Sequence, residues 1–139
     1  PYVIEYNVRM GDPESEAVLP RIKSDLLELL LSVSKDQLNN QQVIIDNKES
    51  ATVFLVSGGY PEQYEKNKEI FGLDKVSDSI VFHAGAKYEE GKVKTNGGRV
   101  IAITSMGATV KEALYKSYNS IKNISFEKMN YRGDIGFDL

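Results

Sequence analysis

Hydrophobic and polar residues alternate at the start of the chain. Between residues 2 and 10, tyrosines, aliphatic residues and a methionine occupy the even positions, whereas the odd positions include Glu5, Asn7 and Arg9. Successive side chains of a β-strand point to opposite faces. The alternation therefore predicts a strand with one apolar and one polar face, which ends at Gly11-Asp12-Pro13.

Two helices are predicted after this strand. Asp12 can cap a first helix that begins at Pro13, because its carboxylate accepts amide hydrogen bonds, and Pro20 breaks or kinks that helix. A second helix begins near Ser24 and is too apolar for a solvent-facing helix, so we expect it to be largely buried. The polar residues 35–42 lack an apolar period and predict a linker.

The remainder, about residues 43–139, shows short strand patterns separated by turns. Strands are predicted over Val43–Ile45, Thr52–Val56, Ser79–Ala84, Lys87–Tyr88, Lys92–Lys94 and Arg99–Thr104. The sequence YEEGKV indicates a hairpin in which Gly91 takes a positive φ. Thr109 and Glu112 form a capping box. The helix after it has one inward face, made of Val110, Ala113, Leu114, Ser117 and Ile121. Antiparallel strands with one amphipathic helix define an α+β fold class.

Composition excludes several classes of function. The 139 residues suffice for one domain, or for a small domain plus a piece of another. The formal charge of −3 is scattered, so no basic stripe for nucleic acid is present, and no apolar run reaches membrane-spanning length. With no cysteine and a single histidine, His83, thiolate and multi-histidine metal sites are excluded. We expect a cytoplasmic protein, and the start at Pro1 inside a strand pattern suggests a fragment of a longer one.

The odd positions of the first strand are the strongest candidate for chemistry. Side chains at i and i+2 of a strand lie roughly 6.5–7 Å apart on one face. The carboxylate of Glu5 and the amide oxygen of Asn7 can therefore converge on a hard cation such as Mg²⁺. Arg9 adds a planar fork suited to phosphate or carboxylate. The alternative is a solvated strand face, and spacing alone does not decide between the two.

Two glycine pairs lie at strand ends, in SGGYP (57–61) and TNGGRV (95–100). Amides of a glycine-rich turn can form a concave anion site, to which Arg99 would add charge. The alternative is a pair of tight turns. Neither matches a Walker phosphate-binding loop, which ends in Gly-Lys-Ser/Thr. Near the C-terminus, Arg132 and Asp134 can pair with each other or reach a ligand.

Several blocks together resemble one enzyme family. EYNVRMGDPESEAVLPRIKSDLLELL is similar to the end of the ATP-grasp domain of the phosphoribosylamine–glycine ligase (glycinamide ribonucleotide synthetase) family. VSGGYP, VFHAG, TNGGRV and YRGDIG follow in the order expected for that family's C-terminal domain. The resemblance implies an ATP-grasp remnant of one strand plus helices over residues 1–36. It implies a small, mainly antiparallel β domain with one amphipathic helix over residues 37–139.

The resemblance also implies an activity. Members of the family join glycine to 5-phosphoribosylamine through glycyl phosphate, giving glycinamide ribonucleotide, ADP and phosphate in purine biosynthesis. Glu5 and Asn7 would be ligands of Mg²⁺ or Mn²⁺, with ATP as co-substrate. Arg9 would stabilise the acyl-phosphate stage, and Asp12 would orient the cap or the glycine amine.

The ribose 5-phosphate would lie at Gly97, Gly98 and Arg99, by analogy with related purine-pathway enzymes. We expect the full-length enzyme to be a monomer, and the fragment to be inactive alone and to self-associate through its exposed first strand. Two other functions stay open at this point. One is a binding module that reuses this domain without catalysis. The other is an ATP-grasp ligase with a different acid substrate, against which GDPE and TNGGR argue through the resemblance.

Overall fold

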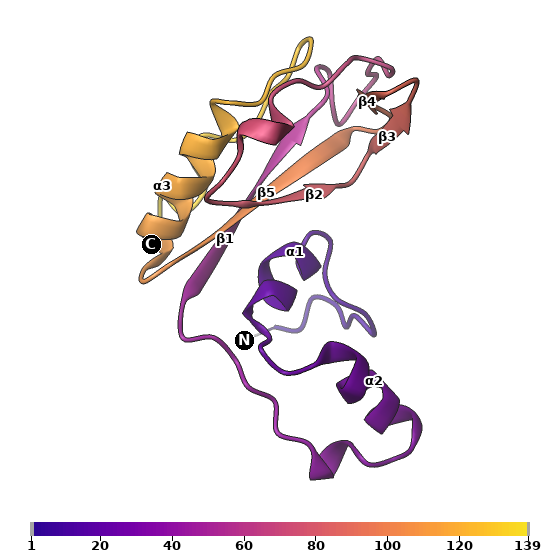
Figure 1. Ribbon diagram of the computed structural model, residues 1–139, viewed down its shortest axis with the longest axis vertical. Coiled ribbons are helices and arrows are strands. Elements are labelled where there is room, and N and C mark those ends of the chain that lie inside the picture. Colours follow the sequence, from indigo (N-terminus) through magenta and orange to yellow (C-terminus); the bar gives the residue numbers. More distant parts are fainter. Residues whose placement is uncertain (1, 139) are drawn as a thin grey trace. The chain divides into compact units, whose positions relative to one another are not determined.

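The computed structural model describes residues 2–138 and divides the chain into two compact units (Figure 1). The first unit ends at Asn47, and the second begins at Lys48. The sequence placed a domain boundary between residues 36 and 37, inside the first unit. No helix within residues 2–138 has the length and apolarity needed to cross a lipid bilayer.

The first unit consists of short helices and extended segments. Helix α1 spans Ser15–Val18 and continues into a 3₁₀ turn at Leu19–Arg21, so the regular helix ends before Pro20 as predicted. Helix α2 spans Leu26–Ser34. The Asp25 carboxylate caps α2 by accepting the amide hydrogens of Leu27 and Glu28, at 2.9 and 3.1 Å. A further 3₁₀ turn covers Leu38–Asn40.

Three predictions for the first unit are wrong. Residues 2–10 are extended but form no strand, and Val43–Ile45 contributes a single antiparallel bridge, between Ile45 and Ile22. A strand needs a neighbouring strand for its N–H and C=O groups, and within residues 2–138 no segment pairs with residues 2–10. Asp12 does not cap α1, whose N-cap residue is Glu14.

The expected burial of the second helix is also wrong. Within α2 only Leu29 and Ser32 are buried. The other apolar side chains of the helix are exposed, namely Leu26, Leu27, Leu30, Leu31 and Val33. The unit contains too few elements to cover a helix that is apolar on more than one face.

The second unit is built on a three-stranded antiparallel sheet. Its strands are β1 (Glu49–Val56), β2 (Ile80–His83) and β5 (Arg99–Gly107), in the order β1-β5-β2. Strands β3 (Ala86–Glu89) and β4 (Lys92–Thr95) form a separate hairpin. The expected α+β class is confirmed to the extent that this unit combines helix with antiparallel sheets, and each strand predicted after residue 50 overlaps an observed one.

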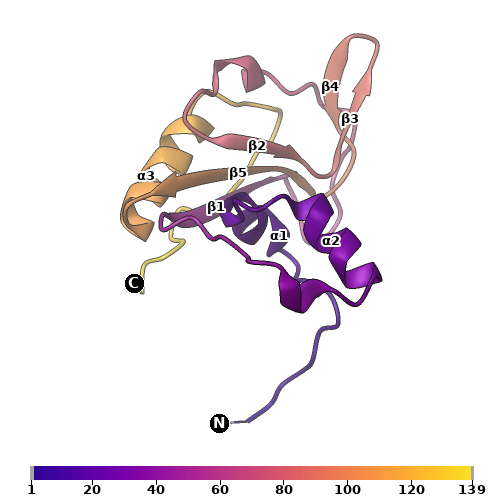
Figure 2. The same cartoon turned by 60° about the horizontal axis from the view of Figure 1, so that its bottom comes forward.

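Helix α3 (Val110–Ile121) packs on β1 and β5 (Figure 2). Thr109 accepts the Glu112 amide hydrogen at 3.2 Å, and the Glu112 carboxylate accepts that of Ala108 at 2.8 Å, which confirms the cap. The predicted inward face is buried except for the half-buried Val110. The core beneath it includes Val53, Leu55, Ile70, Val100, Ile101, Ile103, Ile124 and Phe126.

A serine on the inward face of α3 has a structural explanation. The Ser117 hydroxyl donates to the Ser105 hydroxyl at 2.9 Å and lies 3.2 Å from the Ala51 carbonyl oxygen. Ser79 in turn bonds the hydroxyls of Ser105 and Ser120, at 2.6 and 2.7 Å. These hydroxyl groups satisfy one another, so small polar residues allow the helix to approach the sheet without unpaired buried groups.

An ion-pair cluster gives the second unit a measurable pH dependence. Lys68 and Lys128 donate to the Glu65 carboxylate at 2.6 and 3.0 Å and lower its pKa from 4.5 to about 2. A pKa lowered by folding stabilises the fold above the ordinary value, and the contribution is lost as pH falls from 4.5 toward 2. Since Glu65 is exposed, the effect is small.

We therefore expect the Glu65→Gln chain to unfold at a lower urea concentration than the wild-type chain at about pH 7. The difference between the two midpoint concentrations should disappear near pH 2. Urea unfolding followed by circular dichroism across this pH range measures it. Glu62→Gln is the matched control, because Glu62 has no ion-pair partner within residues 2–138. A gap of constant size from pH 7 to pH 2 would contradict the assignment.

Candidate functional site

The structure brings Glu5 and Asn7 together. The Asn7 side-chain amide donates to the Glu5 carboxylate at 2.9 Å, and both residues are exposed. Although residues 2–10 are not paired in a sheet, their extended backbone still places positions i and i+2 on the same side. Within residues 2–138 no group of three or more histidine, cysteine, aspartate or glutamate side chains could hold a metal ion.

The donor chemistry of this pair fits a hard cation. A carboxylate and an amide oxygen are two of the oxygen ligands that Mg²⁺ takes, and such ions keep several waters or phosphate oxygens as their other ligands. The observed hydrogen bond places the amide nitrogen, rather than the amide oxygen, against Glu5. Rotation of the Asn7 amide would present its oxygen, together with a Glu5 carboxylate oxygen, to a cation. The pair thus offers two of the oxygen ligands that such an ion takes.

Arg9 and Asp12 lie close to this pair in the chain. The Arg9 guanidinium donates to the carbonyl oxygen of Met10 at 2.7 Å, beside a shallow hollow that Asn7 and Glu14 also line. The Glu14 carboxylate accepts the amide hydrogen of Gly11 and so fixes the turn that contains Asp12. Arg9 and Asp12 are exposed.

Three glycine-rich segments meet at one end of the sheet in the second unit, where β1 and β2 end and β5 begins. We call this region the glycine junction, which comprises residues 57–60, Gly85 and residues 96–99. The Gly85 amide donates to the Arg99 carbonyl oxygen at 2.8 Å, and the Gly85 carbonyl oxygen accepts the Asn96 amide hydrogen at 2.7 Å. Two blocks that lie apart in the sequence, VFHAG and TNGGRV, are therefore joined by backbone bonds.

Residues 57–60 close the glycine junction from the other side. Ser57 donates its amide hydrogen to the Gly98 carbonyl oxygen at 2.8 Å and its hydroxyl to that of Gly97 at 2.9 Å. The Tyr60 ring covers Gly98 so closely that a Cβ built on Gly98 would lie 2.1 Å from its Cδ2 atom. Close approach of a ring to the backbone is the reason for glycine at position 98.

Arg99 contributes the positive charge of the glycine junction. It is half-buried at the start of β5, and its guanidinium lies 5.6 Å from the centre of the Phe54 ring. An arginine over an aromatic face is held by cation–π attraction and by stacking. The structure thus brings Gly97, Gly98 and Arg99 together in one anchored loop.

Ser57 and Tyr60 were not predicted as functional residues from the sequence. Both belong to the VSGGYP block, and Ser57 is 4% exposed. A serine directly before a glycine pair was the available signal, but its partners lie about forty positions further along the chain.

The sequence also predicted that Arg132 and Asp134 could pair with each other or reach a ligand. Arg132 and Asp134 pair with each other through two bonds of 2.9 and 3.0 Å, which lowers the pKa of Asp134.

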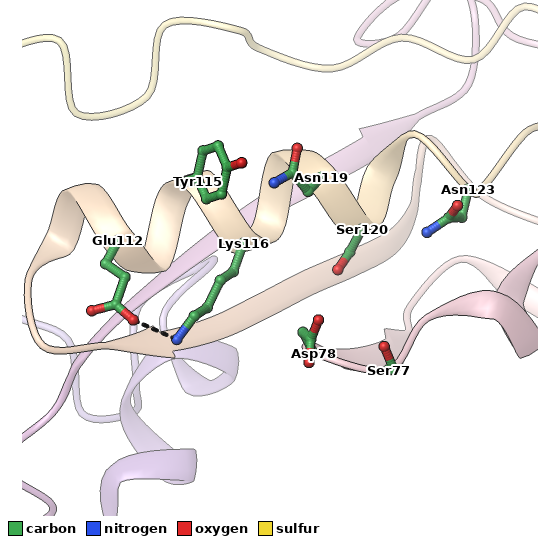
Figure 3. Close-up of a pocket in the computed structure, with 8 residues that line it drawn as sticks. All are labelled: Ser77, Asp78, Glu112, Tyr115, Lys116, Asn119, Ser120 and Asn123. Carbon is green, nitrogen blue, oxygen red and sulfur yellow. Dashed lines mark ion pairs between the residues drawn. The ribbon is translucent and has the colours of Figure 1, made fainter.

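A polar hollow of about 390 Å³ beside α3 is a less convincing site (Figure 3). Its lysine, Lys116, pairs with Glu112 at 2.7 Å and also donates to the Met106 carbonyl oxygen at 3.1 Å. Lys116 also lowers the pKa of Glu112. Because Lys116 and Glu112 neutralise each other within one turn of the helix, Asp78 is the remaining charged residue among those that line the hollow.

The antiparallel sheet, its single packed helix and the glycine junction together define a small α+β domain. A family model described as phosphoribosylglycinamide synthetase, C domain, matches residues 50–138. The chain belongs to this family. The match confirms the resemblance drawn from the sequence blocks.

Individual relatives match almost the whole chain. Phosphoribosylamine–glycine ligase of Caldanaerobacter subterraneus subsp. tengcongensis is 42% identical over 135 residues, which cover 97% of this chain and 32% of the relative. A bifunctional purine biosynthetic protein of Pichia angusta is 47% identical over 137 residues, covering 97% of this chain and 17% of that protein. The chain therefore spans about a third or less of the curated relatives that it matches.

A solved structure shows the same fold. The crystal structure of phosphoribosylamine–glycine ligase from Thermotoga maritima is 34% identical in sequence and superposes with a TM-score of 0.77. The match covers 96% of this chain and 33% of that chain.

Proposed function

We propose that this chain acts as the C-terminal part of an ATP-dependent phosphoribosylamine–glycine ligase. The observation that carries the proposal is the extent of the match. The family model begins at residue 50, whereas the ligase relatives match 97% of the chain and so extend into the unit that contains Glu5 and Asn7. In this proposal residues 1–36 are the end of an ATP-grasp domain, and residues 37–139 are the C-terminal domain.

The reaction joins glycine to 5-phosphoribosylamine at the expense of ATP. The glycine carboxylate attacks the γ-phosphate of ATP to form glycyl phosphate and release ADP. The amine of phosphoribosylamine then attacks the acyl carbon, phosphate leaves, and the amide of glycinamide ribonucleotide forms. The first step brings two anions together, so groups that shield negative charge are required.

Glu5 and Asn7 would hold Mg²⁺ or Mn²⁺ with their two side-chain oxygens. The ion, when bound, would shield the phosphate oxygens of ATP from the attacking carboxylate. Arg9 lies next along the same extended segment, and its fork suits the charge of the acyl-phosphate stage. Asp12, exposed in the adjacent turn, would orient the glycine amine.

The glycine junction would bind the 5-phosphate of phosphoribosylamine. Its loop combines the backbone of Gly97 and Gly98 with the guanidinium of Arg99, and a phosphate ester is recognised by this combination of amide donors and an arginine fork. The anchoring bonds from Ser57 and Gly85 give the loop a fixed shape before the substrate arrives.

The proposal includes the setting of the enzyme. A cytoplasmic location and a monomeric full-length ligase accord with small-molecule substrates in purine biosynthesis, the process named for the relatives. The 139-residue chain by itself would not cleave ATP. It would self-associate through residues 2–8, where Tyr2, Ile4, Tyr6 and Val8 are exposed.

A graft tests the proposed function. This chain would replace the matching C-terminal third of the Caldanaerobacter ligase. The grafted enzyme is expected to turn over ATP continuously only when glycine and phosphoribosylamine are both present, because glycyl phosphate must react with the amine before a second ATP is cleaved. The control is the Caldanaerobacter ligase that lacks its C-terminal third, which should be inactive. A folded graft that fails to cleave ATP would contradict the proposal.

A further inference from the structure

Ser57 holds two neighbouring carbonyl groups at once. It lies directly after β1 and is 4% exposed. Its hydroxyl donates to the Gly97 carbonyl oxygen at 2.9 Å, and its amide donates to the Gly98 carbonyl oxygen at 2.8 Å. In a regular strand, consecutive carbonyl groups point to opposite sides. Here Ser57 draws both to the same side.

This arrangement fixes the direction of the intervening amide. The peptide bond between Gly97 and Gly98 is trans, so its N–H points opposite to its C=O. The Gly98 N–H therefore points away from Ser57. Within residues 2–138 this N–H has no hydrogen-bond acceptor, although Gly98 is a buried residue. Buried amides without an acceptor are rare in proteins, and a donor of this kind suits a ligand oxygen.

The surroundings of the amide select for an anion. The next residue is Arg99, whose guanidinium stacks on Phe54. The Tyr60 ring covers the Gly98 Cα and prevents the loop from shifting toward it. A backbone donor and a guanidinium in one anchored loop match a phosphate monoester, which carries about −1.5 to −2 charges and three acceptor oxygens.

We infer that Ser57 is the positioning residue of this phosphate site, and that it aims the Gly98 amide at the phosphate of the substrate. The inference rests on the proposed ribose 5-phosphate site and adds the residue that builds it. Ser57 itself does not contact the substrate, since both of its donors are already used on the loop carbonyls.

The test is a titration of the ¹⁵N-labelled 139-residue chain with ribose 5-phosphate, followed through the Gly98 amide signal. The wild-type chain should bind, with a downfield shift of the Gly98 amide proton. The Ser57→Ala chain should bind ribose 5-phosphate about tenfold more weakly, because the Gly97 carbonyl oxygen loses its hydroxyl donor. The shift of the Gly98 amide proton should also disappear. Ser34→Ala, which removes a similar hydroxyl-to-carbonyl bond of 2.7 Å from α2, should behave as wild type.

The outcomes separate the inference from the function on which it rests. Unchanged affinity and an unchanged Gly98 shift in a folded Ser57→Ala chain would overturn the role of Ser57 and leave the phosphate site intact. Absence of ribose 5-phosphate binding by the wild-type chain would overturn the site and the inference together. Should Ser57→Ala fail to fold, the wild-type titration still decides, because binding without a Gly98 shift would refute the inference.

Discussion

Glu5→Gln in the grafted enzyme is expected to lower ligase turnover by at least about 100-fold. Loss of groups that merely support a metal ligand commonly costs 10- to 100-fold, and a ligand itself should cost no less. The substitution keeps the size of the side chain and its contact with Asn7 but removes the charge that holds the cation. Steady-state ATP cleavage in the presence of both substrates measures the effect.

Glu28→Gln provides the matched control for this change. Glu28 is an exposed carboxylate of the same unit, on α2, and its loss alters the net charge equally. We expect turnover within about twofold of the unsubstituted graft. Equal loss in the two variants, or partial activity of Glu5→Gln that excess Mg²⁺ does not change, would argue that Glu5 is not a metal ligand.

Gly98→Ala is expected to destabilise the second unit by about 1–3 kcal/mol, the usual cost of overpacking. The new methyl group would lie 2.1 Å from the Tyr60 ring, so the ring or the loop must move. Urea unfolding of the 139-residue chain gives the change in free energy. Gly133→Ala is the control, because nothing lies within 4 Å of a Cβ at that position, and its stability should be close to wild type.

A second substitution shows whether the Tyr60 ring is the cause. In a Tyr60→Ala background the alanine at position 98 meets no ring, so its additional cost should fall below about 0.5 kcal/mol. If Gly98→Ala costs the same with and without the Tyr60 ring, the close contact does not explain the glycine.

Elements whose pattern and partners are both local to the second unit were predictable from the sequence. Helix α3 carried its capping box at Thr109 and its inward face in one continuous stretch, and the structure has both. The β3–β4 hairpin followed from Gly91, which has a φ of +78° beside Glu90 at +53°. Such turns require positive φ and reveal themselves by residue type.

The failures of the sequence analysis arise where the answer depends on distant residues. The alternation over residues 2–10 specifies two faces, but strand formation also needs a hydrogen-bonded neighbour, and the described part of the chain contains none for this segment. The apolar composition of α2 likewise predicts burial without specifying what covers the helix.

The candidate site shows the same division. The spacing of Glu5 and Asn7 sufficed to predict that they lie on one side of the chain, because side chains two positions apart on an extended backbone point the same way. The glycine pair and Arg99 were identifiable by residue type. The contact of Ser57 with this loop was not predictable, because its hydrogen-bond partner lies forty positions away and a serine side chain gives no sign of a long-range partner.

The most direct test of the account is incorporation of labelled glycine into glycinamide ribonucleotide by the grafted enzyme. With ATP and phosphoribosylamine present, the account predicts product formation that follows ADP release one for one, and its loss in Glu5→Gln. A folded graft that forms no labelled product, while the unmodified Caldanaerobacter ligase does so under the same conditions, would contradict the claim that this chain serves as the C-terminal part of the ligase.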